Sequence, residues 1–237
     1  MDQKLIVTDR LSKSYGGLFA LRDLSLSLDS GRIIGLLGPN GSGKTTLIKI
    51  LAGLLTPTAG RALIDGSEPG ERTKSLVSYL PERPYFNSYM TVSECLSFFE
   101  DFYADFDRLQ AERMLLSLGV PVDAKLKHLS KGTKEKVQLV LVMSRRARLY
   151  LLDEPIAGVD PAARDYILKT IISSRNPDSS VLISTHLIAD VESFLDEFLL
   201  INRGQLMLSG DVKRLHAERN MSLDHYFREV FACSANY

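Results

Sequence analysis

One segment of the sequence has the residue types and spacing that bind phosphate groups. Residues 38–45 read Gly-Pro-Asn-Gly-Ser-Gly-Lys-Thr and fit the pattern G-x-x-x-x-G-K-[ST]. Glycines let the backbone N–H groups of such a loop turn inward around phosphate oxygens, and a following helix adds its positive end. We expect Lys44 to reach the β- and γ-phosphates of a nucleotide and the Thr45 hydroxyl to coordinate Mg²⁺. The predicted nucleotide-binding residues of this loop are Gly38, Pro39, Asn40, Gly41, Ser42, Gly43, Lys44, Thr45 and Thr46.

Two adjacent acidic residues end an apolar run in the second half of the chain. Residues 149–155 read Leu-Tyr-Leu-Leu-Asp-Glu-Pro. Beside a phosphate-binding loop, we expect Asp153 to hold Mg²⁺ through water and Glu154 to polarise the attacking water as a general base. Taken alone, the run is more simply a strand that ends in an ordinary acidic turn. Because the phosphate-binding loop is also present, the two motifs together predict a P-loop NTPase.

The elements around these motifs are the ones that would bring them to one edge of a sheet. Residues 32–37 form a continuous apolar run, typical of a buried strand, and residues 45–55 have helical spacing. Residues 149–152 and 181–184 are further candidates for buried strands, with a helix expected at 161–174 between them. Strands that alternate with helices imply a parallel core sheet with helices on its faces.

The remaining parts of the chain differ in character. Up to about residue 65 the sequence is β-rich, with a short strand expected at 5–8 and an alternating, half-buried strand at 24–28. From about residue 91 to 148 the pattern is helical. The last expected elements are strands at 197–201 and 205–208 joined by a hairpin turn at Arg203-Gly204, and a helix at 222–231.

Composition and length narrow the class of protein further. The chain has 237 residues, and its 29 Lys and Arg residues balance 29 Asp and Glu residues, so no net charge favours nucleic acid or an anionic membrane. Its apolar stretches are shorter than the ~20 residues that span a bilayer, and its start lacks the features of a signal peptide. We therefore expect a soluble protein whose membrane role, if it has one, comes through a partner.

A third motif points to one class of P-loop NTPase. Residues 129–133 read Leu-Ser-Lys-Gly-Thr and open a helix expected to run to about residue 147. With this motif the chain resembles, over nearly its whole length, the ATP-binding domains of ABC proteins, whose signature is usually Leu-Ser-Gly-Gly-Gln. The resemblance implies an α/β fold: a P-loop NTPase core with a mixed or parallel sheet, an N-terminal antiparallel β subdomain and an inserted α-helical subdomain. The implied boundaries, within one domain of residues 1–237, are 1–84 and 149–215 for the catalytic core with the β subdomain, 85–148 for the helical subdomain with the signature, and 216–237 for the C-terminal helix.

The resemblance also implies roles for single positions. Tyr15 matches the aromatic residue that stacks on adenine, and Asp160, in Ala-Gly-Val-Asp, matches the loop that crosses the dimer interface. His186 matches the switch histidine. Glu82 falls where the family usually has glutamine; its carboxylate can ligate Mg²⁺ more strongly than an amide, and its charge beside the acidic pair can raise a pKa when no metal is bound. The implied catalytic residues are Lys44, Glu154 and His186, and the implied metal ligands are Thr45, Glu82 and Asp153.

The signature motif implies a second subunit. In this family two domains pair head to tail, so the Ser130 hydroxyl and the Gly132 N–H of one subunit would touch the γ-phosphate held by the other, aided by the helix dipole. ATP would then hold the closed dimer together, and hydrolysis would release it. Lys131 and Thr133 stand where Gly and Gln are usual. Lys131 either adds positive charge near phosphate or points to solvent.

Aromatic side chains are concentrated between residues 85 and 106. Helical spacing predicts that most of them belong to a core. A more specific hypothesis is that Tyr85, Phe86 and Tyr89 line a groove for a helix of a membrane partner, because they directly follow Glu82. The residues expected to share one buried helical face are Leu96, Phe99, Phe102 and Tyr103.

The resemblance implies an ATP-binding and hydrolysing subunit that drives a separate membrane permease. Residues 79–82 (Tyr-Leu-Pro-Glu) and 129–132 (Leu-Ser-Lys-Gly) look like the branch that drives small exporters of drugs, peptides and antibiotics. The implied cofactors are ATP and Mg²⁺. The implied partners are integral membrane permease subunits and a second ATPase subunit, identical or related, with no nucleic acid, at the cytoplasmic face of the cell membrane.

Two other functions compete with this interpretation. One is a soluble ABC-class ATPase that acts on ribosomes or DNA; a single domain without a heptad run and with balanced charge fits it poorly. The other is a degenerate, regulatory subunit. The presence of Lys44, Asp153, Glu154 and His186 argues against it.

Overall fold

A six-stranded mixed sheet forms the centre of the computed structural model, which describes residues 4–157 and 159–234. Residues 1–3 and 235–237, at the ends of the predicted domain, and Gly158, within the expected interface loop, lie outside the described residues. The strands run in the order β5-β6-β7-β3-β8-β9, and only β9 is antiparallel to its neighbour. Their bounds are β3 (Ile33–Leu37), β5 (Val77–Leu80), β6 (Leu149–Asp153), β7 (Ser180–Thr185), β8 (Glu197–Asn202) and β9 (Gln205–Asp211).

The central strands are buried on both faces, which explains their continuous apolar sequences. Every residue of β3, β6 and β7 is buried. The predicted hairpin between β8 and β9 is confirmed: Arg203 (φ +46°) and Gly204 (φ +76°) form its two-residue turn, and both have the positive φ that such tight hairpins need.

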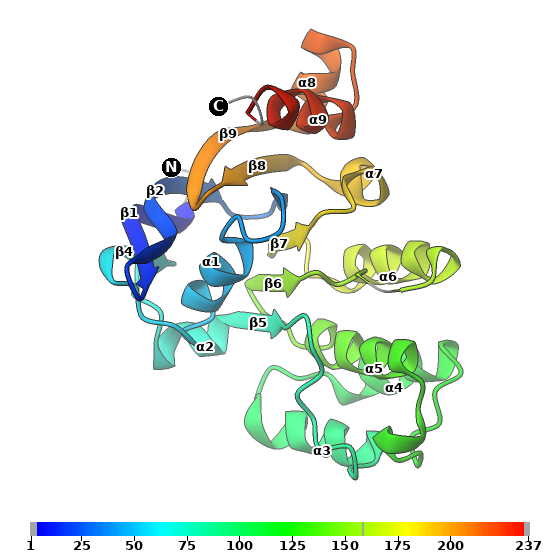
Figure 1. Cartoon of the computed structure of the whole chain (residues 1–237). Coiled ribbons are helices and arrows are strands. Elements are labelled where there is room, and N and C mark those ends of the chain that lie inside the picture. Colours follow the sequence, from blue (N-terminus) through cyan, green and yellow to red (C-terminus); the bar gives the residue numbers. More distant parts are fainter. Residues whose placement is uncertain (1–3, 158, 235–237) are drawn as a thin grey trace.

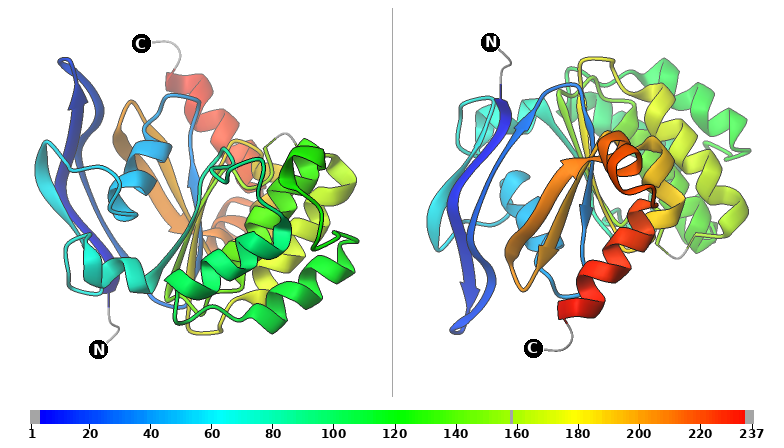
Figure 2. Two further views of the ribbon diagram at one scale, coloured as in Figure 1. Left: turned by 90° about the horizontal axis from the view of Figure 1, so that it is seen from below. Right: turned by 90° about the horizontal axis from the view of Figure 1, so that it is seen from above.

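A smaller antiparallel sheet covers one face, as the fold prediction required. It contains β1 (Lys4–Tyr15), β2 (Leu18–Asp29) and β4 (Ala59–Ile64) in the order β2-β1-β4. Helix α1 (Lys44–Leu51) lies between the two sheets and shares one apolar core with both (Figure 2). The expected strand at 5–8 was too short, because β1 continues through an irregularity at Arg10 (φ +43°) and stays paired with β2.

Helices cover the other face of the large sheet and extend beyond its β5 edge (Figure 1). Three of them share a separate apolar core at that edge: α3 (Val92–Phe102), α4 (Arg108–Ser117) and α5 (Lys131–Met143). The others on that face are α6 (Pro161–Ser174), α7 (Ile188–Val191), α8 (Val212–Arg219) and α9 (Leu223–Ser234). Helix α2 (Glu71–Leu76) lies apart from them, directly before β5. Among the described residues, no helix combines the length and the apolar character needed to cross a bilayer.

Buried Arg145 ties the three-helix unit to the sheet. Its guanidinium donates to the backbone carbonyls of Val77 (2.6 Å) and Ser75 (3.1 Å) and to the carboxylate of Asp105 (3.0 Å to Oδ1). Tyr103 lies against the cation, with its ring centroid 3.8 Å from Cζ. A buried charge needs partners of this kind, so this residue fixes where the unit joins the rest of the chain.

Two expectations about the aromatic segment at residues 85–106 are wrong. Phe99 is buried, but Phe102 is 70% exposed, because the helical stripe is narrower than the sequence suggested. Tyr85, Phe86 and Tyr89 do not line one groove. Tyr85 lines a cavity of about 770 Å³ between α1 and α3, Phe86 lines a separate cavity of about 260 Å³, and Tyr89 lies under Lys127, whose Nζ is 5.0 Å from the ring centroid.

Candidate functional site

The predicted phosphate-binding loop and the acidic pair meet at the carboxyl ends of the central strands of the large sheet. Strands β6, β7 and β3 are neighbours and parallel, so their carboxyl ends lie side by side. A cavity of about 490 Å³ opens there. Its lining includes residues 40–46 together with Glu82, Glu154 and His186. Parallel sheets hold ligands at this position, outside the carboxyl ends of their strands.

The loop between β3 and α1 depends on glycine at two positions. A Cβ on Gly38 would lie 2.2 Å from the carbonyl oxygen of Ile201. Gly43 has φ +106°, and a Cβ there would lie 2.4 Å from the carbonyl oxygen of Ala20. The loop is therefore pressed against neighbouring backbone and keeps a shape that a side chain would prevent.

Lys44 lies inside this loop, at the start of α1. Its Nζ donates to the carbonyl oxygens of Gly38 (2.7 Å) and Pro39 (3.2 Å) and is 4.0 Å from Glu154 Oε1. Burial lowers the pKa of Lys44, and the charges of Glu154 and Asp153 oppose that shift. The ammonium is thus held at the mouth of the loop, where a phosphate can replace the two carbonyls.

The Asp153 carboxylate is buried next to the hydroxyl of Thr45. Its Oδ1 accepts hydrogen bonds from Ser184 Oγ (2.6 Å) and Thr45 Oγ1 (3.1 Å). Its Oδ2 is buried and has no hydrogen-bond partner among the described residues. Burial raises the pKa of Asp153, the two hydroxyls oppose the rise, and the charge of Glu82 adds to it. Hydroxyl and carboxylate oxygens are ligands that Mg²⁺ prefers, so these residues fit the ion.

Glu154 has an unusual backbone and is held at both ends. Its φ is +52°, a left-handed conformation that side chains other than glycine seldom adopt. Its N–H bonds to the carbonyl oxygen (3.0 Å) and to Oγ (3.1 Å) of Ser184. Its Oε2 forms a hydrogen bond with His186 Nδ1 (3.0 Å). The side chain remains partly exposed to the cavity, where it can contact a water molecule.

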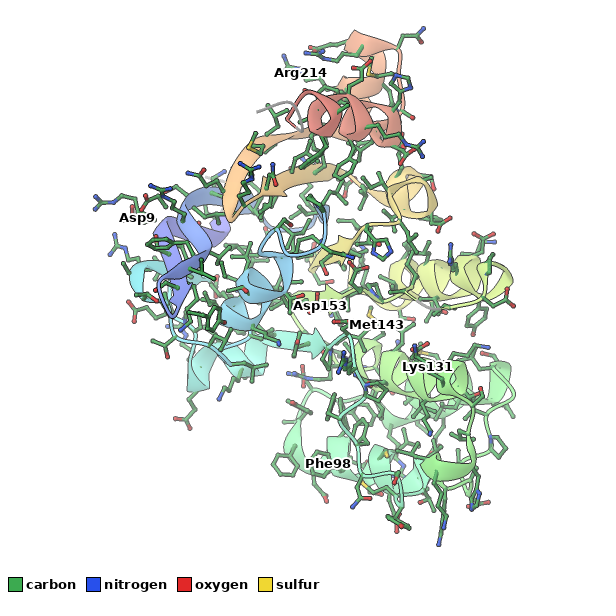
Figure 3. The ribbon with its side chains drawn as sticks, in the orientation of Figure 1. Asp9, Phe98, Lys131, Met143, Asp153 and Arg214 are labelled. Carbon is green, nitrogen blue, oxygen red and sulfur yellow. The ribbon has the colours of Figure 1, made fainter. Side chains whose placement is uncertain are left out.

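Other predicted residues lie away from this cavity. Ser130 accepts a hydrogen bond from the N–H of Thr133 and so caps α5; its hydroxyl is 2.8 Å from Thr133 Oγ1. The side chain of Lys131, labelled on α5 in Figure 3, is 76% exposed, and its Nζ lies 3.8 Å from Glu135 Oε1 of the same helix. Tyr15, at the end of β1, is 49% exposed. Gly132 and Asp160 lie at the first turn of α5 and directly before α6.

Sequence reasoning missed Ser184 as part of the site. It pairs with Asp153 in the register of β6 and β7 and is fully buried. The signal was present, because Ser184 ends an expected strand two residues before His186. Only the pairing of two strands about thirty residues apart shows that it faces the acidic pair.

Comparisons with known proteins identify the family and the fold. The sequence profile described as "ABC transporter" matches residues 21–157. The chain is 34% identical to the "SkfA peptide export ATP-binding protein" of Bacillus subtilis, over 86% of this chain and 88% of that one. It is 33% identical to an uncharacterized ABC transporter ATP-binding protein of Synechocystis over 81% of its own length, and spans 57% of that relative. A solved ATP-binding subunit of an ABC transporter superposes with a TM-score of 0.84 at 29% identity, covering 96% of this chain and 99% of the other.

Proposed function

This chain belongs to the ABC transporter family of ATP-binding proteins, and from that premise we propose that it binds and hydrolyses MgATP to drive a membrane exporter. One observation carries the proposal: the phosphate-binding loop and Glu154 line a single cavity, and the buried Asp153 carboxylate lies directly behind Thr45 of that loop. The peptide-export role named for the Bacillus relative supports the direction of transport.

Each residue of the cavity has a task in this mechanism. The N–H groups of the loop and Lys44 bind the phosphates, and Thr45, Asp153 and Glu82 supply oxygen ligands for Mg²⁺. The ion, when bound, neutralises charge that develops on the phosphate oxygens. Glu154 takes up the proton of the attacking water, and His186 holds the Glu154 carboxylate in place. Because Glu154 is held at both ends, it needs little rearrangement before reaction.

A second ATPase subunit completes the site in this proposal. Ser130 and Gly132 lie at the exposed start of α5 rather than in the cavity of their own chain. A partner paired head to tail would bring its own pair of these residues to the γ-phosphate, with Asp160 at the interface and Tyr15 against adenine. Residues 1–84 and 149–215 would then act as the catalytic core, 85–148 as the helical subdomain with the signature, and 216–237 as the C-terminal helix.

We further propose that a permease binds the helical side and holds the chain at the cytoplasmic face of the membrane. The cavity of about 770 Å³ between α1 and α3 supports this contact, because exposed apolar side chains surround it. Tyr85, Phe102 and Leu54 are all more than half exposed there. Tyr85→Ala with Phe102→Ala is expected to weaken the complex with a permease, and the exposed Leu109→Ala on α4 serves as control.

The first experiment is to tag the chain in its own cell, solubilise membranes gently and identify the proteins that co-purify. A polytopic membrane protein is the expected result, and an additional ATPase would indicate a heterodimer. Ribosomal proteins or DNA-processing factors without a membrane protein would contradict the transporter role and favour the alternative of a soluble ABC-class ATPase. Nucleotide binding is tested separately: Lys44→Ala is expected to lose MgATP binding.

A further inference from the structure

We infer that Ser184 is a positioning residue that sets the geometry of both carboxylates of the proposed hydrolytic site; the inference rests on the proposed ATP hydrolysis. Ser184 lies on β7 directly opposite Asp153 of β6 and is fully buried. Its single O–H donates to Asp153 Oδ1 at 2.6 Å, and its oxygen accepts the N–H of Glu154 at 3.1 Å. One hydroxyl therefore joins the two acidic residues.

The first consequence concerns which oxygen of Asp153 is available. Ser184 and Thr45 both donate to Oδ1, whereas Oδ2 has no partner among the described residues. A carboxylate held at one oxygen cannot rotate freely about the bond to its Cβ. Ser184 thereby directs Oδ2 as the free acceptor for a metal ion or for water bound to the ion. Thr45 is itself a predicted metal ligand, so Ser184 is the donor that stays in place when the ion binds.

The second consequence concerns the backbone of Glu154. A residue other than glycine at φ +52° is strained by about 1–3 kcal/mol and persists only where neighbours determine its conformation. The N–H of Glu154 is shared between the carbonyl oxygen and the hydroxyl of Ser184. The other end of the side chain bonds to His186, two residues further along. The segment 184–186 thus holds the proposed general base at its backbone and at its carboxylate.

A comparison with Ser180 of the same strand argues that the Ser184 hydroxyl is not needed merely to hold the strand in the sheet. Ser180 is also buried, but its Oγ makes only long contacts, 3.5 Å to Asp29 O and 3.5 Å from Arg32 N. Strand β7 pairs with β6 through its backbone at both serines, and also with β3 at Ser184, so neither hydroxyl is needed for the sheet. Ser180→Ala is therefore a matched control, with equal burial and the same change in volume, far from the cavity.

The test compares Ser184→Ala, Ser184→Cys and Ser180→Ala in the full chain with its co-purified partner. Three quantities are measured: kcat for MgATP, KM for MgATP, and the Mg²⁺ concentration that gives half-maximal binding of a fluorescent ATP analogue. For Ser184→Ala we expect kcat to fall about 10- to 100-fold with KM changed less than about twofold, because misplacement of reacting groups acts on the chemical step. The Mg²⁺ requirement should rise. Ser184→Cys, a weak donor of similar size, should lie in between, and Ser180→Ala should match wild type.

The outcomes separate this inference from the proposed function. If wild type hydrolyses ATP and the Ser184 variants keep its kcat and Mg²⁺ requirement, the inference is wrong and the proposed function stands. Equal losses in Ser180→Ala and Ser184→Ala would also overturn it, since they would show a general effect on the strand. If wild type neither binds nor hydrolyses ATP, the proposed function fails and the inference fails with it. Thermal unfolding within a few degrees of wild type verifies that each variant is folded.

Discussion

Two regions carry parts of the same proposed chemistry, yet they are built differently. One is the edge of the sheet where β3, β6 and β7 end at the nucleotide cavity, and the other is the start of α5. At the edge, Lys44 and Asp153 are almost fully buried, and each makes hydrogen bonds within the cavity region. At the start of α5, the Ser130 hydroxyl bonds to Thr133 of its own helical turn, and Lys131 is mostly exposed, with Glu135 of the same helix beside it. The first region is packed against its own chain, and the second is displayed on the surface.

The contrast indicates which chain each region serves. Groups that act on a nucleotide held by their own chain gain from burial, because neighbours then hold them in position before binding. Groups that act on a nucleotide held by another chain must remain accessible until the two chains meet. The exposed signature is therefore expected to contribute to hydrolysis only in a dimer, and single substitutions in the two regions should have different consequences.

The largest effect is expected at the edge of the sheet. Glu154→Gln removes the proposed general base while keeping a side chain of the same shape, so hydrolysis should fall about 10²- to 10⁴-fold. Binding of MgATP should be retained, and dimers should accumulate. Phosphate release measures hydrolysis, and size-exclusion chromatography with MgATP measures the nucleotide-bound dimer. Hydrolysis at the wild-type rate would remove Glu154 from the role of base.

A smaller loss is expected at the signature. Ser130→Ala removes one hydroxyl from the proposed contact with the partner's nucleotide, and we expect hydrolysis to fall about tenfold, as for one hydrogen bond to a charged group. Nucleotide binding to the isolated chain should be unchanged, unlike in Lys44→Ala. If two copies pair head to tail, mixing Ser130→Ala with Lys44→Ala leaves one site with both parts intact and should restore activity. Weakened nucleotide binding by the isolated Ser130→Ala chain would contradict the contrast between the regions.

Because Asp153 is buried at the cavity, the stability of the protein should depend on its ionisation, and the exposed signature should have no such pH-dependent effect. Burial raises the pKa of Asp153 in the folded protein above its value in the unfolded chain. A carboxyl shifted in this direction favours the folded state at low pH, and that contribution is lost as pH rises through the folded-state pKa. Without Mg²⁺ and nucleotide, Asp153→Asn should therefore unfold at a higher temperature at pH 7, by about 2–4 °C for each kcal/mol gained.

The same difference in unfolding temperature should shrink as pH falls through the folded-state pKa of Asp153 toward its lower unfolded-state pKa, because the wild-type carboxyl is then protonated in the folded protein. Ser130→Ala controls for the pH dependence: loss of the α5 cap lowers the unfolding temperature by a similar amount at each pH, since no buried charge is changed. A lower unfolding temperature for Asp153→Asn at pH 7 would show that hydrogen bonds to the carboxylate outweigh its desolvation.

The smallest effect is expected for Glu82→Gln, which restores the residue usual in the family. Glu82 is exposed at the rim of the cavity, so water screens much of its charge. We expect a rise of about two- to threefold in the Mg²⁺ concentration needed for half-maximal hydrolysis, and little change in kcat. A titration with Mg²⁺ at saturating ATP measures the effect. A loss as large as that of Glu154→Gln would place Glu82 among the buried, indispensable groups.

Local patterns predicted much of the fold. The phosphate-binding loop, the buried strands β3, β6 and β7, helix α6 and the β8–β9 hairpin all have sequence signals that short-range physics produces: apolar runs, helical spacing and turn residues. Exposure was less predictable. Phe102 was expected on a buried helical face but lies exposed, because the width of the buried stripe depends on which neighbours pack against it.

By itself, the sequence determined the nature of the chemistry: a loop that fits phosphate, two carboxylates after an apolar run, and a signature that opens a helix. The tertiary structure decided which of these groups meet. The strand order β6-β7-β3 places Asp153 beside Thr45 and Ser184, whereas Ser130, at the start of α5 in the three-helix unit, does not line the cavity. The physical reason is that residue types and local spacing are properties of the chain, whereas the pairing of strands separated by loops and helices is set by how the whole core packs.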